Sequence, residues 1–313
     1  MDMKTLPTEQ RNPDTVRIDE VSTLAMLQMI NNEDKKIAAC VERHLPEIAA
    51  AIDATAEKFA AGGRIVYCGA GTSGRMGFMD SAECPPTYGI PKDRVVSLIA
   101  GGLAAINQAK EDAEDHPEYG MADLKAIHFT VGDVLVGLAA SGRTPYVVGA
   151  MEYANALGAV TLSVTCNESA SCPVNRLAQY PIGIYAGPEA ITGSTRMKAG
   201  TVQKLVLNML STGVMIKTGK VYSNLMVNLA LNNEKLVTRA QGIVAEITGA
   251  PHEEIEKLLA QTDRNVPLTI FMLLTGCPED RARGYLSNEN GHIKNALNAY
   301  RGSGHGSTEQ EKN

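Results

Sequence analysis

The sequence predicts an α/β fold: a five-stranded parallel sheet flanked by helices, with N-terminal helices and a small all-helical C-terminal region. Three observations predict it. Five short apolar runs alternate with helical stretches, glycine- and hydroxyl-rich turns follow some of these runs, and strand-like runs end near residue 217. Buried strands that alternate with helices are typical of a parallel sheet covered on both faces. Ligands of such sheets bind at the carboxyl ends of the strands.

The first region, residues 1–62, is predicted to be a polar arm followed by helices. The arm covers about the first twenty residues and contains Pro7 and Pro13. Helical periodicity then covers residues 22–30 and 33–44. A further helix is expected from Pro46, since proline is tolerated in a first helical turn, to the glycine pair at 62–63.

The second region, residues 63–219, is predicted to hold the sheet and the ligand site. Its five expected strands are the apolar runs Ile65–Cys68, Val95–Ile99, Val134–Leu138, Val160–Val164 and Ile182–Tyr185. Each run is short enough to be a buried strand, and the segments between them have helical character. One long helix is expected from Thr195 to about Lys217.

The third region, residues 220–301, shows helical patterns interrupted by glycine and proline near 249–251, 267 and 276–278. We therefore expect several short helices without strands. The tail, residues 302–313, is rich in glycine and serine and then charged, which predicts disorder.

Composition limits the class of protein. The 313 residues are 44% hydrophobic and 20% charged, with a net charge of −6. This acidic balance disfavours a nucleic-acid-binding protein, which usually presents a basic face. No apolar run approaches the ~18 residues of a membrane span, and the N-terminus lacks a signal-peptide core. The six cysteines form no metal-type CxxC pair, so reduced thiols in a cytoplasmic protein are expected.

Three turns rich in serine, threonine and glycine predict a phosphorylated small molecule as ligand. The first contains Gly71, Thr72, Ser73 and Gly74, the second Ser141, Gly142 and Thr144, and the third Ser194 and Thr195. A glycine-rich turn between a strand and a helix presents backbone N–H groups and the positive end of the helix dipole to an anion. A dinucleotide site is the alternative for the first turn, but no acidic residue ends the second predicted strand.

Four segments carry a resemblance to a known family. They are residues 6–12 (LPTEQRN), 71–75 (GTSGR), 81–87 (SAECPPT) and 193–201 (GSTRMKAGT). Read together they resemble the N-acetylmuramic acid 6-phosphate etherases, a family of sugar isomerase (SIS) domain proteins, over nearly the whole chain to about Arg301. The second turn also resembles the phosphosugar-binding turn of SIS domains, although Ala139 replaces a serine that is frequent there.

The resemblance implies catalytic and binding residues. It implies Glu83 and Glu114 as the acid and base that cleave a lactyl ether, with the two roles exchangeable. By itself, the acidic run around Glu114 favours a solvated helix face. Glu83 has small and apolar neighbours, so burial and a raised pKa are expected. Arg75, Arg143, Arg196 and Lys198 are candidates for the lactyl carboxylate, and Arg196 and Lys198 are included among the predicted substrate-binding residues. The elimination requires no cofactor and no metal is expected.

Two alternatives remain open. SIS domains also serve as non-catalytic phosphosugar sensors, which need the phosphate turns but not Glu83 and Glu114. A sugar isomerase would need a base near carbon 2 but no pocket for a lactyl carboxylate. The resemblance further implies a homodimer, and the apolar surface of the N-terminal helices is consistent with burial between two subunits.

Overall fold

The computed structural model describes residues 7–108, 110–169, 171–231 and 234–305. These residues group into two compact units. The first unit comprises residues up to Ala82 together with Lys92–Gly213, and the second comprises Glu83–Pro91 together with the chain from Val214 onward.

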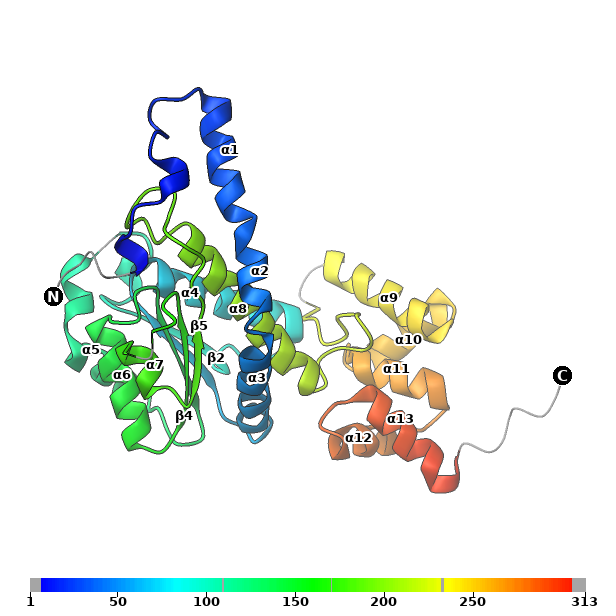
Figure 1. The fold of residues 1–313 in the computed structure, drawn as a ribbon. Helices are drawn as coiled ribbons and strands as arrows, with labels where there is room; N and C mark the ends of the chain where they lie inside the picture. Colours follow the sequence, from blue (N-terminus) through cyan, green and yellow to red (C-terminus); the bar gives the residue numbers. More distant parts are fainter. Residues whose placement is uncertain (1–6, 109, 170, 232–233, 306–313) are drawn as a thin grey trace. The chain divides into compact units, whose positions relative to one another are not determined.

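The first unit contains the predicted parallel sheet (Figure 1). The strands lie in the order β2-β1-β3-β4-β5, and every neighbouring pair is parallel. Their bounds are β1 Ile65–Gly69, β2 Val95–Ile99, β3 Val134–Ala139, β4 Val160–Thr165 and β5 Tyr180–Gly183. After β2 the chain crosses back to add β3 on the other side of β1. The topological switch point, where open α/β sheets bind ligands, therefore lies between β1 and β3.

Helices cover both faces of this sheet because its side chains alternate in direction. Val66 and Cys68 of β1 pack in a core cluster with Tyr146 and Val147 of helix α6 (Pro145–Ala156). Tyr67 between them donates its hydroxyl hydrogen to Asp80 of helix α4 (Gly71–Tyr88), which lies on the other face. The remaining covering helices are α3 Leu45–Ala60, α5 Pro117–Ala126, α7 Pro173–Leu177 and α8 Lys198–Lys217.

The N-terminal helices agree with the predicted pattern. Helix α1 spans Thr23–Asp34, and Ser22 accepts a hydrogen bond from the Ala25 N–H at its start. Helix α2 spans Lys36–Glu42, and α3 carries Pro46 in its first turn and ends two residues before Gly62. Figure 1 shows α3, α2 and α1 following one another as a column, with α1 beyond the sheet.

The second unit has its own helical core. Helix α11 (Val266–Thr275) is its most apolar element, and Phe271 stacks with Tyr285 and meets the edge of Tyr300. Its other helices are α9 Glu234–Thr248, α10 His252–Gln261, α12 Glu279–Asn288 and α13 Ile293–Tyr300. In the described part of the chain, no helix is both long and apolar enough to cross a membrane.

Three boundaries differ from the sequence prediction. Strand β5 lies two residues earlier than expected, because its pairing with β4 starts at Tyr180 opposite Leu162. Helix α8 begins at Lys198 and not at Thr195. The predicted disordered tail lies outside the described residues from 306 onward, whereas residues 301–305 form one π-helical turn.

Candidate functional site

Two of the three predicted turns lie side by side at the switch point of the sheet. Strands β1 and β3 pair directly, with Gly69 opposite Leu138. The first turn follows β1 at Ala70, and the second follows β3 at Ala140. The carboxyl ends of these two neighbouring strands therefore deliver both turns to one place, where this class of sheet binds ligands.

The first turn needs its glycines for close packing. Gly71 has a φ of +51°, which glycine adopts without the cost that a side chain would bring. A Cβ at Gly74 would lie 2.6 Å from Cγ1 of Ile99. Helix α4 starts at Gly71, and the first N–H groups of a helix have no acceptor within the helix. The turn thus presents N–H groups at the positive end of an 18-residue helix, an arrangement that favours anions.

The second turn packs against the segment that follows β4. Gly142 has a φ of +70°, and a Cβ on it would lie only 2.1 Å from the Cys172 sulfur. The Asn167 amide donates to the Ser141 carbonyl at 3.0 Å. Thr144 occupies the N-cap position of α6, yet its side chain makes no capping hydrogen bond. The Thr144 hydroxyl is therefore not used to cap the helix.

The third turn lies close to the first, but the N–H groups of the helix that follows it are already bound by a carboxylate of the protein. A Cβ on Gly200, two residues into α8, would lie 3.3 Å from the Thr72 methyl carbon. At the start of α8, the Glu189 carboxylate accepts the N–H groups of Lys198 and Ala199, each at 2.9 Å. Burial raises the pKa of Glu189, and these two N–H groups partly oppose that shift. A protein carboxylate thus occupies the place that a phosphate would take.

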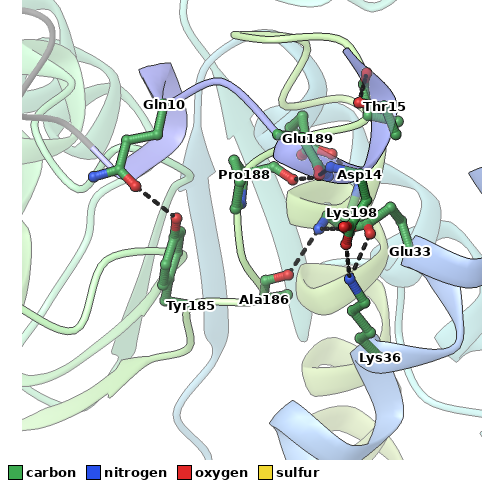
Figure 2. A network of polar contacts seen from close by, with 12 residues as sticks. Gln10, Asp14, Thr15, Glu33, Lys36, Tyr185, Ala186, Pro188, Glu189 and Lys198 are labelled. Atoms are coloured by element: carbon green, nitrogen blue, oxygen red, sulfur yellow. Dashed lines mark hydrogen bonds and ion pairs between the residues drawn. The ribbon is translucent and has the colours of Figure 1, made fainter. Parts of the chain in front are cut away.

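Lys198 has a different environment from the one that sequence analysis expected. Its side chain is 2% exposed, and its ammonium lies 2.5 Å from the Glu33 carboxylate and donates to the Ala186 carbonyl at 2.9 Å (Figure 2). These contacts favour a structural role over contact with substrate. Arg75 is also engaged, since its guanidinium donates to the Ile106 and Ala105 carbonyls. Arg196 is exposed, and Arg143 is half-buried.

A cavity of about 140 Å³ joins Glu114 to the first turn. Glu114 lies in the short 3₁₀-helix Glu111–Asp115, and its side chain is exposed. The cavity is lined by Ala70, Gly71, Arg75, Ala100, Ala105, Lys110 and Glu114. An expected catalytic carboxylate and an expected phosphate-binding turn therefore face one space. Lys110 was missed by sequence analysis, because a lysine beside an acidic run gives no signal of its own.

Glu83 is not buried, which corrects the expectation from its apolar neighbours. It lies within α4, which continues through Pro85 and Pro86 to Tyr88. Its side chain is exposed, whereas the adjacent Cys84 is 2% exposed. The helix directs Cys84 into the protein and Glu83 toward solvent, so small neighbours in sequence did not produce burial. Glu83 belongs to the second unit and Glu114 to the first.

Within the described ranges, no cluster of three or more histidine, cysteine, aspartate or glutamate side chains is arranged to hold a metal ion. The site instead offers a carboxylate, a lysine, hydroxyl groups and backbone N–H groups. Such groups bind anions and transfer protons.

The chain is similar in sequence and in fold to known proteins. Residues 47–155 match the family model of the glucokinase regulatory protein N-terminal SIS domain. The N-acetylmuramic acid 6-phosphate etherase of Clostridium beijerinckii is 54% identical over 297 residues, which are 95% of this chain and 97% of that protein. The etherase of the same name from Vibrio vulnificus is 52% identical, over 95% of this chain and 99% of that protein. A phosphoheptose isomerase structure from Francisella tularensis aligns with a TM-score of 0.46 and 16% identity, over 63% of this chain and 100% of that one.

The fold and its turns define a parallel α/β protein of the SIS type. Sequence identity of more than 50% to etherases, along nearly the whole chain, identifies the family within this class. This chain belongs to the N-acetylmuramic acid 6-phosphate etherase family.

Proposed function

We propose that this protein cleaves the lactyl ether of N-acetylmuramic acid 6-phosphate to give N-acetylglucosamine 6-phosphate and lactate, in the recycling of cell-wall sugars. Its near full-length similarity to etherases supports this activity. The single observation that carries the proposal is the cavity that Glu114 shares with the glycine turn at Gly71. This cavity supports the proposal because it brings a carboxylate next to the turn that we propose as the phosphate site.

The reaction that suits these groups is an elimination followed by addition of water. A base removes the proton on carbon 2, which is acidic because it lies next to the aldehyde of the open-chain sugar. The bond between carbon 3 and the ether oxygen breaks, and an acid protonates the departing lactate. Water then adds across the double bond, which restores a proton on carbon 2 and a hydroxyl on carbon 3. Two carboxyl groups in different environments suit this acid–base work.

We assign Glu114 as the base at carbon 2 and Glu83 as the acid on the lactate oxygen, with the assignment reversible. The phosphate is held by the N–H groups of Gly71 to Ser73 and by the Ser73, Ser141 and Thr144 side chains. Gly74 lets the turn pack closely, and its own N–H donates to the Ala70 carbonyl at 3.1 Å. The Thr72, Gly142, Ser194, Thr195 and Arg196 positions line the remainder of the proposed site. Thr144 fits this role because its hydroxyl does not cap α6.

We further propose a cytoplasmic homodimer that acts on a small-molecule phosphosugar. All six cysteines are buried and none forms a disulfide, as expected of a protein from a reducing compartment. Helix α1 exposes Leu24 and Leu27, which supports burial of this helix against a second copy.

Lactate release from N-acetylmuramic acid 6-phosphate by the purified protein tests the proposed activity. A phosphosugar sensor is the second candidate, favoured by the match to the regulatory-protein SIS domain. The two separate in one experiment, because a sensor binds N-acetylglucosamine 6-phosphate in calorimetry but releases no lactate. Binding without lactate release would replace the etherase proposal by the sensor.

A further inference from the structure

The loop that leads into the third turn is held by side chains from the very beginning of the chain. We define the support loop as residues 186–191, between β5 and the third turn. The Asn12 amide donates to the Pro188 carbonyl at 3.0 Å, and the Thr15 hydroxyl donates to the Ala190 carbonyl at 2.8 Å. Both side chains are buried. Residues about 175 positions apart in sequence are thereby fixed together.

The orientation of the Asn12 amide is itself fixed. Its oxygen accepts the N–H of Asp14 at 2.9 Å, so its nitrogen is left to face the support loop. Asn12 also caps the short 3₁₀-helix Pro13–Thr15, which carries the Thr15 hydroxyl to Ala190. This single helical turn therefore places the Asn12 and Thr15 donors so that they reach the carbonyls of Pro188 and Ala190, which are two residues apart in the support loop.

The same loop is also bound by buried charged side chains. Lys198 donates to the Ala186 carbonyl and pairs with Glu33 of α1. Glu189 accepts the first N–H groups of α8. Ala186, Pro188, Glu189 and Ala190 of the support loop are thus held by α8 or by the arm.

The restrained loop leads directly to residues at the proposed site. The third turn follows with the half-buried Ser194 and Thr195. The Gly200 N–H donates to the Thr195 carbonyl at 3.0 Å, and Gly200 packs against Thr72 of the first turn. A shift of the support loop would therefore displace both the third turn and its contact with the first.

We infer that the N-terminal arm, residues 7–20, positions the third turn for the phosphosugar, with Asn12 and Thr15 as positioning residues. The inference rests on the proposed function of the site. Burying charges costs free energy that apolar packing would not cost, whereas a fully bonded polar network rigidifies a single arrangement. Apolar packing would suffice to attach the arm to the protein. A fully bonded polar network is needed only where the third turn must be held in one precise position.

The test compares two buried threonines. Thr15→Val keeps the side-chain shape and deletes the bond to Ala190. We expect the KM for N-acetylmuramic acid 6-phosphate and the Kd for N-acetylglucosamine 6-phosphate to rise about fivefold, the loss of one hydrogen bond, with kcat nearly unchanged. Thr15→Ser, which keeps the hydroxyl, should restore both constants.

Thr55→Val is the matched control. Thr55 is fully buried, and its hydroxyl bonds only within α3, to the Ala51 carbonyl at 2.7 Å. Its variant should lose a similar amount of thermal stability without a change in KM or Kd. Equal KM and Kd values for Thr15→Val and Thr55→Val would overturn the inference.

Asn12→Asp gives an independent measurement should Thr15→Val not fold. It keeps the acceptor for the Asp14 N–H and removes the amide donor that bonds Pro188 and Glu33, so a rise in Kd at least as large is expected and an unchanged Kd would also overturn the inference. Lactate release by the wild-type protein is measured first. Absent lactate release refutes the proposed activity, while the ratio of Kd values still tests the positioning role.

Discussion

Glu33 is a buried carboxylate between two lysine side chains. Its side chain is 3% exposed, and the ammonium groups of Lys198 and Lys36 each lie 2.5 Å from it. Burial by itself would raise the pKa of Glu33, but hydrogen bonds from Lys198, Lys36 and Asn12 outweigh burial and lower it from 4.5 to about 2. A carboxyl group with a lowered pKa stabilises the fold above its unfolded pKa, and this stability is lost as the pH falls toward the folded pKa.

We therefore expect Glu33→Gln to destabilise the protein at neutral pH, by about 3 kcal/mol, because Lys198 would be left buried without its counter-charge. Between about pH 5 and pH 2 the variant should lose stability less steeply than the wild type. Urea unfolding across this range measures both effects. Glu20→Gln is the control, since Glu20 pairs with Arg17 at an exposed site. If the free energy of unfolding changed with pH in the same way for Glu33→Gln and the wild type, the lowered pKa of Glu33 would be contradicted.

The two proposed catalytic carboxylates have separable signatures. Glu114→Gln should lower lactate release by about 10² to 10⁴, and it should also abolish exchange of the carbon 2 proton with deuterium from solvent. Glu83→Gln should lower lactate release by a similar factor while that exchange continues. Mass spectrometry of recovered substrate measures the exchange.

Asp115→Asn is the control for Glu114, because Asp115 lies in the same exposed 3₁₀-helix but does not line the cavity at Gly71. Its activity should stay near that of the wild type. Persistent exchange in Glu114→Gln, with loss of exchange in Glu83→Gln, would reverse the two roles. Persistent lactate release in either variant would remove that residue from the mechanism.

At the scale of the element, the turn between β3 and α6 carries two of the hydroxyl groups that we propose as phosphate ligands. Ser141→Ala and Thr144→Val should each weaken binding of N-acetylglucosamine 6-phosphate by about tenfold, the loss of a hydrogen bond to a charged group. Binding of N-acetylglucosamine, which lacks the phosphate, should hardly change. Calorimetry with both ligands supplies its own control, and equal losses for the two ligands would show that the turn acts on the fold and not on the phosphate.

The elements themselves were largely predictable from the sequence. Strands β1 to β4 coincide with short apolar runs, because both faces of a parallel sheet are buried. The last strand was placed two residues late, since Ile184 is fully buried although it lies beyond the end of β5. The start of α8 was placed early, because the group that binds its first N–H groups is Glu189, nine residues before Lys198. A capping group so remote gives no local sequence signal.

The site was predictable only in part. Strand–turn–helix patterns sufficed for the glycine and hydroxyl turns, since turn chemistry is local. The place of Glu114 came from resemblance, because an acidic run does not reveal which of its carboxylates faces a cavity. The environment of Lys198 was not predictable, because its contacts are remote in sequence. Its partner Glu33 is 165 residues away. The sequence around Lys198 therefore indicates a cation within a motif but gives no sign that this cation is in a buried ion pair.

At the scale of the whole molecule, helix α1 carries more apolar surface than its own unit covers. Leu24 is 67% exposed and Leu27 is 53% exposed, while Met26, Met29 and Ile30 are half-buried. Single exposed leucines are ordinary. Two leucines on one helix that extends beyond the sheet (Figure 1) are more than a monomer needs, and an isologous contact with a second copy would cover them.

We therefore expect light scattering at micromolar concentration to give twice the 33.3 kDa mass of one chain. Leu24→Glu combined with Leu27→Glu should give the mass of one chain, because apposed carboxylates repel and lose their hydration at an apolar contact. Val131→Glu, at a residue that is 53% exposed elsewhere in the first unit, should leave the mass unchanged. A wild-type mass of 33.3 kDa would refute the dimer. A dimeric double variant would instead exclude Leu24 and Leu27 from the contact, and the second copy would then have to bind another surface of the chain.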